Sequence, residues 1–181
     1  MNQSLTQYLK SGHQTKITPE IKKIANSFTK DGFDLIFEIL AWLHKNLRAE
    51  DNPEIKDKLF RKRTAQEIIK SGFVTGCTDW ALAFIILARV KKIPTRYVEI
   101  IRRRWLEEGK NDFIEGHIFA EVYLNNHWYI IDPEEASIKD WYNRWIIFRR
   151  GLDSWDIGIR NFKDLKEQFL EFRAEYKSQL K

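Results

Sequence analysis

The stretch from Cys77 to Lys91 constrains the fold more than any other part of the sequence, because its residues are apolar at nearly every position. Its apolar side chains are Ala81, Leu82, Ala83, Phe84, Ile85, Ile86, Leu87, Ala88 and Val90. A helix that is apolar on every side must be buried among other elements. Pro94 stops this helix from continuing. The sequence therefore predicts a central helix that the rest of the chain covers.

Three segments before the central helix carry helix signals. Thr18-Pro19 is a typical start, because threonine caps a helix and proline suits its first position. Residues 33–47 carry an apolar stripe at helical spacing. Thr64 and Glu67 are the two halves of a capping box, which predicts a short helix after Thr64. Asn52-Pro53 interrupts the pattern, and we interpret it as a break between helices.

After the central helix the apolar pattern changes from helical to alternating spacing. The predicted strands cover residues 96–101, 116–124, 127–132 and 141–148. Residues 102–115 are charged and show no apolar period, so we interpret them as a connection. A helix returns over residues 161–180, with aromatic side chains on one face. Helices come first, an antiparallel sheet second and a closing helix last, and this order predicts an α+β fold.

Composition narrows the class of protein further. The 181 residues suit one domain over residues 18–181, after a polar and loosely held segment at residues 1–17. Hydrophobic residues make up 43% of the chain, which is enough for a packed core, and one cysteine excludes an internal disulfide. The net charge of +5 is modest, so we do not expect nucleic acid as a partner. No apolar run could cross a membrane and no secretory signal is visible, so we expect no membrane contact and a cytoplasmic location.

The single cysteine stands at a chemically favourable position. Cys77 follows Gly76 and is the first residue of the predicted central helix. A helix N-terminus stabilises a thiolate, and its free backbone amides can bind an oxyanion. Glycine before the cysteine lets a substrate come close. The alternative is that Cys77 is simply a small buried residue.

His117 and Asp132 are positioned to assist this cysteine. They lie on the two predicted strands that Asn125-Asn126 connects. A two-residue turn places Asp132 opposite Phe119, and His117 shares the face of Phe119 because side chains alternate along a strand. His117 and Asp132 are then diagonal neighbours, with about 7–8 Å between their backbones. A slip of one residue would put them on opposite faces.

These residues stand in blocks that resemble the transglutaminase-like superfamily. The blocks are Gly76-Cys77-Thr78-Asp79-Trp80, Arg89 with Ile93-Pro94-Thr95-Arg96, Gly116-His117-Ile118-Phe119-Ala120-Glu121-Val122-Tyr123, and Trp128-Tyr129-Ile130-Ile131-Asp132-Pro133. The resemblance covers about residues 64–134, and the tail at 151–158 is similar to small single-domain members. It implies a papain-like core, with a central helix bearing the cysteine, an antiparallel sheet, and helices before and after. Lys92 stands where the family commonly has glycine, and Phe119 where tryptophan is frequent.

The resemblance also implies a reaction. Cys77 matches the nucleophile, His117 the general base and acid, and Asp132 the residue that orients the imidazole. The family attacks a carboxamide or peptide carbonyl to form a thioester, which water or an amine then resolves. We expect hydrolysis of an amide or peptide bond in a protein or peptide substrate. The alternatives are transglutaminase-type amine transfer, which cross-links proteins, and a non-catalytic binding module that keeps the fold.

Several other side chains have both a functional and an ordinary interpretation. Gln66 could donate an amide to the oxyanion, or it is an exposed helix residue. Trp80 could line the acyl pocket or pack in the core, and Phe119 should shape the pocket. Arg103, within the basic run before Trp105, belongs either to a substrate-selecting rim or to a solvated loop. His44 has no visible partner, so we interpret it as a surface histidine.

A metal centre is not expected. Cys77, His117 and Asp132 are residue types that zinc accepts, but they are too far apart in the sequence to show ligand spacing. A metal bound to these residues would also block the nucleophile. We therefore expect no metal and no cofactor. The sequence does not indicate an oligomeric state or a particular substrate.

Overall fold

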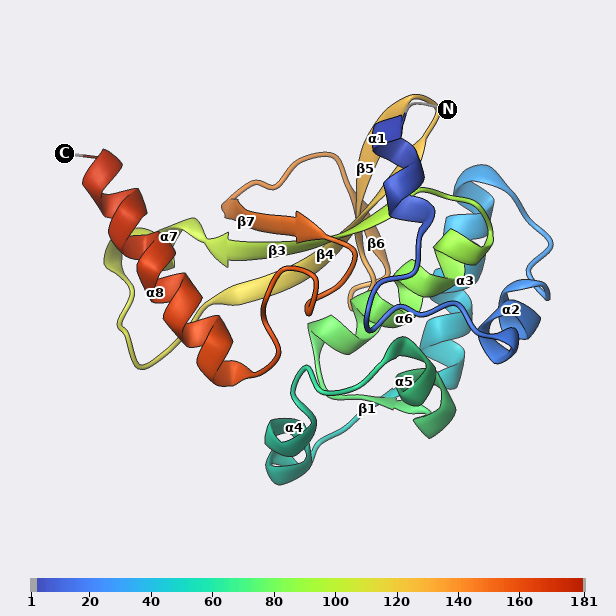
Figure 1. Ribbon diagram of the computed structural model, residues 1–181, viewed down its shortest axis with the longest axis horizontal. Helices are drawn as coiled ribbons and strands as arrows, with labels where there is room; N and C mark the ends of the chain where they lie inside the picture. Colours follow the sequence, from blue (N-terminus) through green and yellow to red (C-terminus); the bar gives the residue numbers. More distant parts are fainter. Residues whose placement is uncertain (1–2, 181) are drawn as a thin grey trace.

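Helix α6 (Cys77–Val90) occupies the centre of the computed structural model, which describes residues 3–180 (Figure 1). Every residue from Thr78 to Arg89 on this helix is buried. On one side α6 packs against helices, and on the other it packs against a sheet. The predicted central helix is therefore confirmed, and its apolar circumference is explained by cover on all sides.

The helices that cover α6 begin where the capping signals placed them. They are α2 (Pro19–Ala25), α3 (Gly32–Asn46) and α5 (Ala65–Ser71). The side chain of Thr18 accepts a hydrogen bond from the amide of Ile21, and both halves of the capping box at Thr64 and Glu67 are present. These caps satisfy amides that the first turn of a helix leaves unpaired.

Asn52-Pro53 does separate two helices, but the second of them, α4 (Pro53–Leu59), was not predicted. The Asn52 side chain accepts a hydrogen bond from the Glu54 amide at 2.9 Å, so it is an N-cap. A parallel pair of two-residue strands, β1 (Arg48–Ala49) and β2 (Phe73–Val74), was also not predicted. Strands this short carry no readable alternation.

A five-stranded antiparallel sheet forms the second layer, in the order β6-β5-β4-β3-β7. Its strands are β3 (Thr95–Arg102), β4 (Gly116–Leu124), β5 (His127–Asp132), β6 (Ser137–Lys139) and β7 (Trp145–Gly151). Asn125 and Asn126 both have positive φ, as the predicted two-residue turn requires. Ala120 pairs with Ile131, so Asp132 follows in register opposite Phe119. The predicted α+β fold and hairpin register are confirmed.

The charged connection before β4 contains a helix that the sequence did not reveal. Helix α7 (Arg103–Glu108) buries Trp105 and Leu106, and the Trp105 ring contacts Phe169 of helix α8 (Phe162–Gln179). Two apolar residues give no period, so only packing against α8 identifies this helix. The closing helix itself is confirmed, and Asn161 caps it through the amide of Asp164.

The N-terminal segment is held more firmly than its polarity suggested. It contains α1 (Gln3–Thr6) and a short 3-10 helix, η1 (Gln7–Leu9). Gln14 and Thr15 are fully buried, and both backbone amides donate to the carboxylate of Asp153. The expectation of a loosely held segment is therefore wrong for these residues. Their backbone amides have a partner in the C-terminal tail, which sequence alone cannot show.

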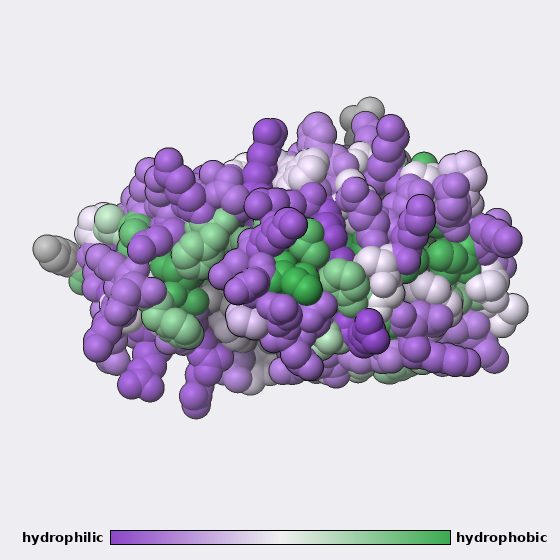
Figure 2. Space-filling view, turned by 90° about the horizontal axis from the view of Figure 1, so that it is seen from below, coloured by the Kyte–Doolittle hydropathy of each residue, from purple (hydrophilic) through white to green (hydrophobic). Residues whose placement is uncertain are grey.

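Among residues 3–180, no helix combines the length and the apolar character that a membrane crossing needs. Figure 2 shows the molecule from below, with hydrophobic side chains in separate patches enclosed by hydrophilic ones. Exposed apolar side chains are ordinary on protein surfaces.

Candidate active site

Cys77 is the first residue of α6, and its side chain is half-buried. A Cβ atom added at Gly76 would meet no atom within 4 Å, so the space beside the thiol is open. The buried carboxylate of Asp79 accepts hydrogen bonds from the Thr75 amide at 2.8 Å and the Thr75 hydroxyl at 2.7 Å. It also pairs with Arg63. These contacts fix the loop that presents Cys77 at the helix N-terminus.

His117 lies at the beginning of β4 and is held by Asp132 of β5. Its Nε2 is 3.1 Å from Oδ2 of Asp132, a side chain that is 2% exposed. An ionised carboxylate only accepts hydrogen bonds, so Nε2 carries the proton. The imidazole also contacts the Phe119 ring edge to face, at 5.0 Å between centroids. The predicted pairing of His117 and Asp132 on one face places them within direct hydrogen-bond distance.

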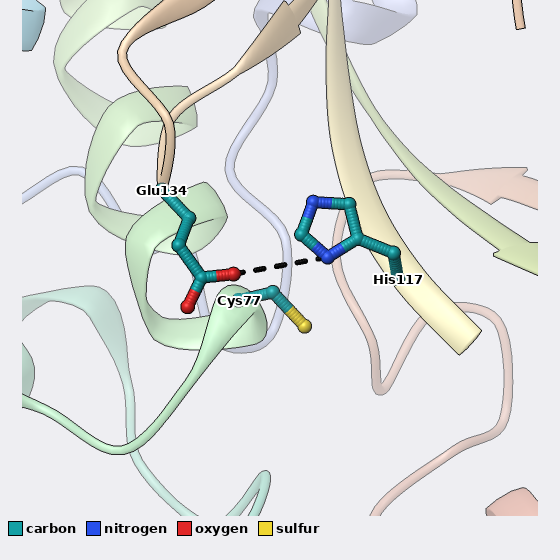
Figure 3. Close-up of side chains that lie close together, drawn as sticks. All are labelled: Cys77, His117 and Glu134. Carbon is teal, nitrogen blue, oxygen red and sulfur yellow. Dashed lines mark ion pairs between the residues drawn. The ribbon is translucent and has the colours of Figure 1, made fainter. Parts of the chain in front are cut away.

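The second nitrogen of His117 faces Cys77 and Glu134 (Figure 3). Sγ of Cys77, a ring nitrogen of His117 and a carboxylate oxygen of Glu134 all lie within 4.8 Å of one another. Nδ1 of His117 is 3.7 Å from Oε2 of Glu134. Sequence reasoning missed Glu134. Its only signal is its place two residues after Asp132, in the tight turn that follows β5.

These contacts change the proton affinity of the imidazole. Burial by itself disfavours the charged ring, but the hydrogen bond that the ring donates to Asp132 and the interaction with Cys77 outweigh it. Together they raise the pKa of His117 to about 10. The pKa of Glu134 is also raised above its usual value, because burial outweighs the attraction of His117. The His117 imidazole therefore binds a proton more tightly than a free histidine does, which favours transfer of a proton from the neighbouring thiol.

His44 on α3 holds the turn that carries Glu134. Its Nε2 is 2.8 Å from the carbonyl oxygen of Pro133, and its ring stacks on Trp80 at 4.4 Å between centroids. The interpretation of His44 as a residue without a partner is therefore wrong. Trp80 is 6% exposed and supports this histidine from α6. Sequence could not reveal the contact, because the two partners of His44 are distant along the chain.

Two hollows flank His117. The first, the thiol pocket, measures about 180 Å³ and is lined by Phe60, Arg61, Cys77, Thr78, Glu99, Ile114, Gly116, His117, Ile118, Phe162 and Leu165. The second, the aspartate pocket, measures about 230 Å³ and is lined by Arg102, Gly116, His117, Phe119, Asp132, Glu135, Lys139 and Trp145. Phe119 thus borders the second hollow, and Trp80 lines neither.

Two of the residues considered from the sequence lie away from the thiol. Gln66 lines a separate groove beside Trp42, and its Nε2 is 3.5 Å from a carboxylate oxygen of Glu20. Arg103 is exposed on α7. Its neighbour Arg102 lines the aspartate pocket instead, with its guanidinium 4.9 Å from the centre of the Trp145 ring.

The cluster around the thiol also has a set of atoms that could bind a metal. Cys77, His117 and Glu134 offer sulfur, nitrogen and oxygen donors, which zinc accepts. This set differs from the one considered from the sequence, because Glu134 replaces Asp132. A metal bound there would occupy the thiolate and the free imidazole nitrogen together.

A thiol, an imidazole and a buried carboxylate thus meet at the junction of the central helix and the antiparallel sheet. The sequence pattern of the transglutaminase-like superfamily matches residues 21–133, so the chain belongs to this superfamily. The resemblance seen in the sequence is thereby confirmed.

The fold of this chain is similar to that of a solved structure. The crystal structure of a protein described as a putative cysteine protease, from Cytophaga hutchinsonii, superposes with a TM-score of 0.65 at 19% sequence identity. The similarity covers 88% of this chain and 50% of that chain, so this chain spans about half the length of that protein. No curated protein matches the sequence at a significant level.

Proposed function

We propose that this protein is a cysteine-dependent acyl-transfer enzyme that hydrolyses an amide or peptide bond through a thioester. Cys77 is the nucleophile, His117 the general base and acid, and Asp132 the residue that orients the imidazole. The observation that carries the proposal is that the thiol sulfur lies within 4.8 Å of an imidazole nitrogen whose ring is hydrogen-bonded to a buried carboxylate. A nucleophile, a base and an orienting group in this order are what covalent catalysis by cysteine needs.

Acylation follows from the position of each atom. Nδ1 of His117 takes the thiol proton, and Sγ of Cys77 attacks the carbonyl carbon of the bound amide. The negative oxygen is stabilised at the N-terminus of α6, where the first backbone bond of the helix is donated by Asp79 to Gly76. The amides of Cys77 and Thr78 precede that bond, so no carbonyl of the helix uses them and they can donate to the oxygen. The imidazolium then protonates the leaving amine, and the C–N bond breaks to give the thioester.

Deacylation returns the enzyme to its starting state. A water molecule gives a proton to Nδ1 of His117 while its oxygen attacks the thioester carbonyl. The C–S bond breaks, the acid leaves, and the imidazolium returns its proton to sulfur. An amine in place of water gives a new amide, which is the transferase alternative. Glu134 supports that alternative, because a carboxylate that is 41% exposed beside the thiol attracts a cationic amine.

The test is to mix the enzyme with a set of chromogenic peptide amides and analyse quenched samples by intact-protein mass spectrometry. We expect one acyl group on Cys77 and release of the amine. Cys77→Ala should abolish both, and His117→Ala should reduce the rate by about 100-fold to 10,000-fold. His127→Ala is the matched control, because His127 is exposed on the β4–β5 hairpin and should leave turnover unchanged.

The same samples separate the alternatives. Turnover that survives Cys77→Ala would sink the proposal, and an intact thiol that no amide or electrophile modifies would favour the binding module. Adding a small primary amine distinguishes the two reactions of an active enzyme. A product that is mainly the free acid supports hydrolysis, and a product that is mainly the new amide supports transfer.

A further inference from the structure

Arg61 is held in an unusual place at the thiol pocket. Its backbone has a φ of 57°, which is a left-handed conformation that residues other than glycine rarely adopt. Its carbonyl accepts hydrogen bonds from Nε2 of Gln14 at 3.1 Å and from Nε1 of Trp155 at 2.7 Å. The side chain is 3% exposed. The N-terminal segment and the C-terminal tail therefore fix this arginine together.

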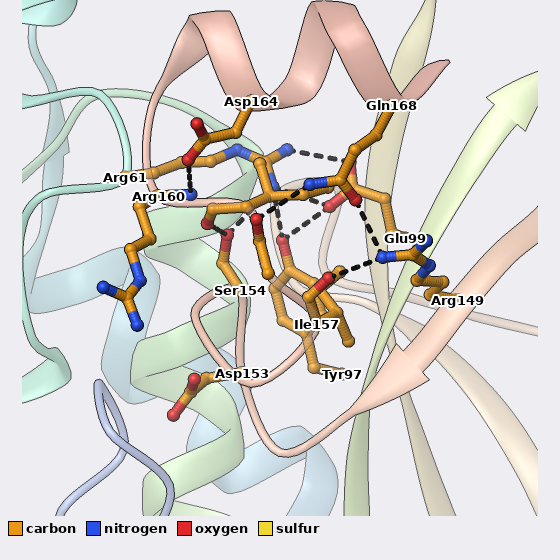
Figure 4. A network of polar contacts seen from close by, with 12 residues as sticks. Arg61, Tyr97, Glu99, Arg149, Asp153, Ser154, Ile157, Arg160, Asp164 and Gln168 are labelled. Atoms are coloured by element: carbon orange, nitrogen blue, oxygen red, sulfur yellow. Dashed lines mark hydrogen bonds and ion pairs between the residues drawn. The ribbon is translucent and has the colours of Figure 1, made fainter. Parts of the chain in front are cut away.

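The guanidinium of Arg61 is almost fully partnered (Figure 4). Nη1 and Nη2 donate to the two carboxylate oxygens of Glu99 at 2.7 and 2.8 Å. Nη1 also lies 3.0 Å from the hydroxyl of Ser154 and 3.3 Å from that of Tyr97. The Nε atom is the one nitrogen of this guanidinium with no hydrogen-bond partner among the residues that the structure describes. A buried N–H group without an acceptor destabilises the folded chain, unless a ligand or a water molecule accepts a hydrogen bond from it.

The pocket around this donor suits a small side chain. Arg61, Glu99 and Cys77 line it together, so the buried guanidinium lies in the wall of the hollow that the nucleophile borders. The remaining walls are mostly apolar, from Phe60, Ile114, Ile118, Phe162 and Leu165. At about 180 Å³ the hollow is smaller than the roughly 300 Å³ at which drug-sized ligand sites begin.

We propose that the thiol pocket selects the acyl part of the substrate, and that it takes a short, uncharged side chain ending in a hydrogen-bond acceptor. Nε–H of Arg61 donates to that acceptor. A carboxylate is disfavoured, because Glu99 already neutralises Arg61 and a second buried negative charge would be unpaired. Two wall residues, Phe162 and Leu165, come from α8, which lies outside the region that matches the family. This inference rests on the proposed function of Cys77.

The experiment uses three peptide vinyl sulfones that differ only in the side chain beside the electrophile. Asparagine, leucine and aspartate side chains have similar size but offer a neutral acceptor, no acceptor and a negative charge. The readout is the second-order rate of Cys77 modification, followed by intact mass. We expect the asparagine probe to react about tenfold faster than either of the others, as one hydrogen bond to a charged donor allows.

A variant assigns the preference to Arg61. Arg61→Lys keeps a positive charge opposite Glu99 but has no donor at the position of Nε, so the asparagine-to-leucine rate ratio should fall to about one. The ratio is used because any change in thiol reactivity affects both probes equally. Arg160→Lys, at an exposed arginine in the tail, is the matched control and should keep the ratio of the wild type.

The wild-type measurement alone tests the proposal if Arg61→Lys does not fold. Equal rates for the three probes, or a faster leucine probe, would overturn the role of the pocket and leave the proposed function intact. If neither the probes nor iodoacetamide modify Cys77, the proposed function fails as well. A ratio that survives in folded Arg61→Lys would show that another group binds the acceptor.

Discussion

At the scale of single residues, His117 is the group on which the proposed chemistry depends. Its two ring nitrogens have separate tasks, because Nε2 is bound to Asp132 and Nδ1 faces the thiol. Its raised pKa also has a consequence for stability. The folded chain binds this proton more tightly than the unfolded chain does, so protonated His117 adds to the free energy of unfolding. This addition is full below pH 6.5 and is lost as pH rises towards about 10.

We predict that the His117 imidazole titrates with a midpoint near 10 in the wild type and at a lower pH in Asp132→Asn. The asparagine removes the negative charge that stabilises the imidazolium. The measurement is the pH dependence of the His117 ring signals by NMR, assigned with His117→Gln. A wild-type midpoint near 6.5 would contradict the structure.

His44 gives a second prediction at this scale. His44→Phe keeps an aromatic ring to stack on Trp80 but loses the hydrogen bond to the Pro133 carbonyl. We expect the free energy of unfolding in urea to fall by about 1 kcal/mol. The same turn follows Asp132 and carries Glu134, so a shift of the turn should also slow the acylation of Cys77. His127→Phe is the control, and equal effects of both variants would argue against this role for His44.

At the scale of elements, the site lies where the start of α6 meets the start of β4, and a glycine precedes both Cys77 and His117. A Cβ at Gly116 would lie 2.8 Å from Cε2 of Phe169 on α8 and 3.3 Å from the carbonyl oxygen of Ile100. A Cβ at Gly76 would lie in open space. The first glycine is therefore needed for packing, and the second leaves room before the thiol.

These two glycines should respond differently to the same substitution. Gly116→Ala should reduce the free energy of unfolding by about 1–3 kcal/mol, because α8 or the strand must move. Gly76→Ala should change it by less than about 0.5 kcal/mol yet slow Cys77 acylation. Urea denaturation and the mass-spectrometric assay measure the two effects. Rescue of Gly116→Ala by Phe169→Leu would confirm the cause, and the opposite pattern of stabilities would refute it.

At the scale of the whole molecule, the two ends of the chain stabilise the core, and both lie outside the residues that match the family. Arg89, near the end of α6, donates to the carbonyls of Thr95 and Leu152 and to the hydroxyl of Thr15. The sheet, the tail and the N-terminal segment therefore meet at one buried guanidinium. Burial lowers the pKa of Arg89 to about 10, although nearby carboxylates oppose the change.

This arrangement predicts that residues 18–181 alone are less stable than the whole chain. Removing residues 1–17 leaves Asp153 and Arg89 without the partners that Gln14 and Thr15 provide. Thermal unfolding of the shortened chain should occur at a clearly lower temperature, since each buried group left unpaired costs about 1–3 kcal/mol. The double variant Gln14→Ala, Thr15→Ala should reproduce much of the loss. An unchanged midpoint would mean that the segment only covers the surface.

Local signals in the sequence predicted the parts of the fold that local interactions form. The capping box at Thr64, the apolar circumference of α6 and the turn at Asn125-Asn126 each depend on residues a few positions apart. The turn fixed the hairpin register, and the register put His117 and Asp132 on one face. Helix α7 was not predicted, because its two buried residues show no helical spacing and are buried only by packing against α8.

The sequence by itself determined the central helix, the α+β order, and the cysteine, histidine and aspartate that meet in the site. Only the tertiary structure decided which other groups surround them. Glu134 faces the free nitrogen of His117, and Arg61 closes the thiol pocket. The physical reason is that these contacts join segments distant along the chain, through side-chain directions that packing sets. These side-chain directions cannot be predicted from residue type or from spacing in the sequence.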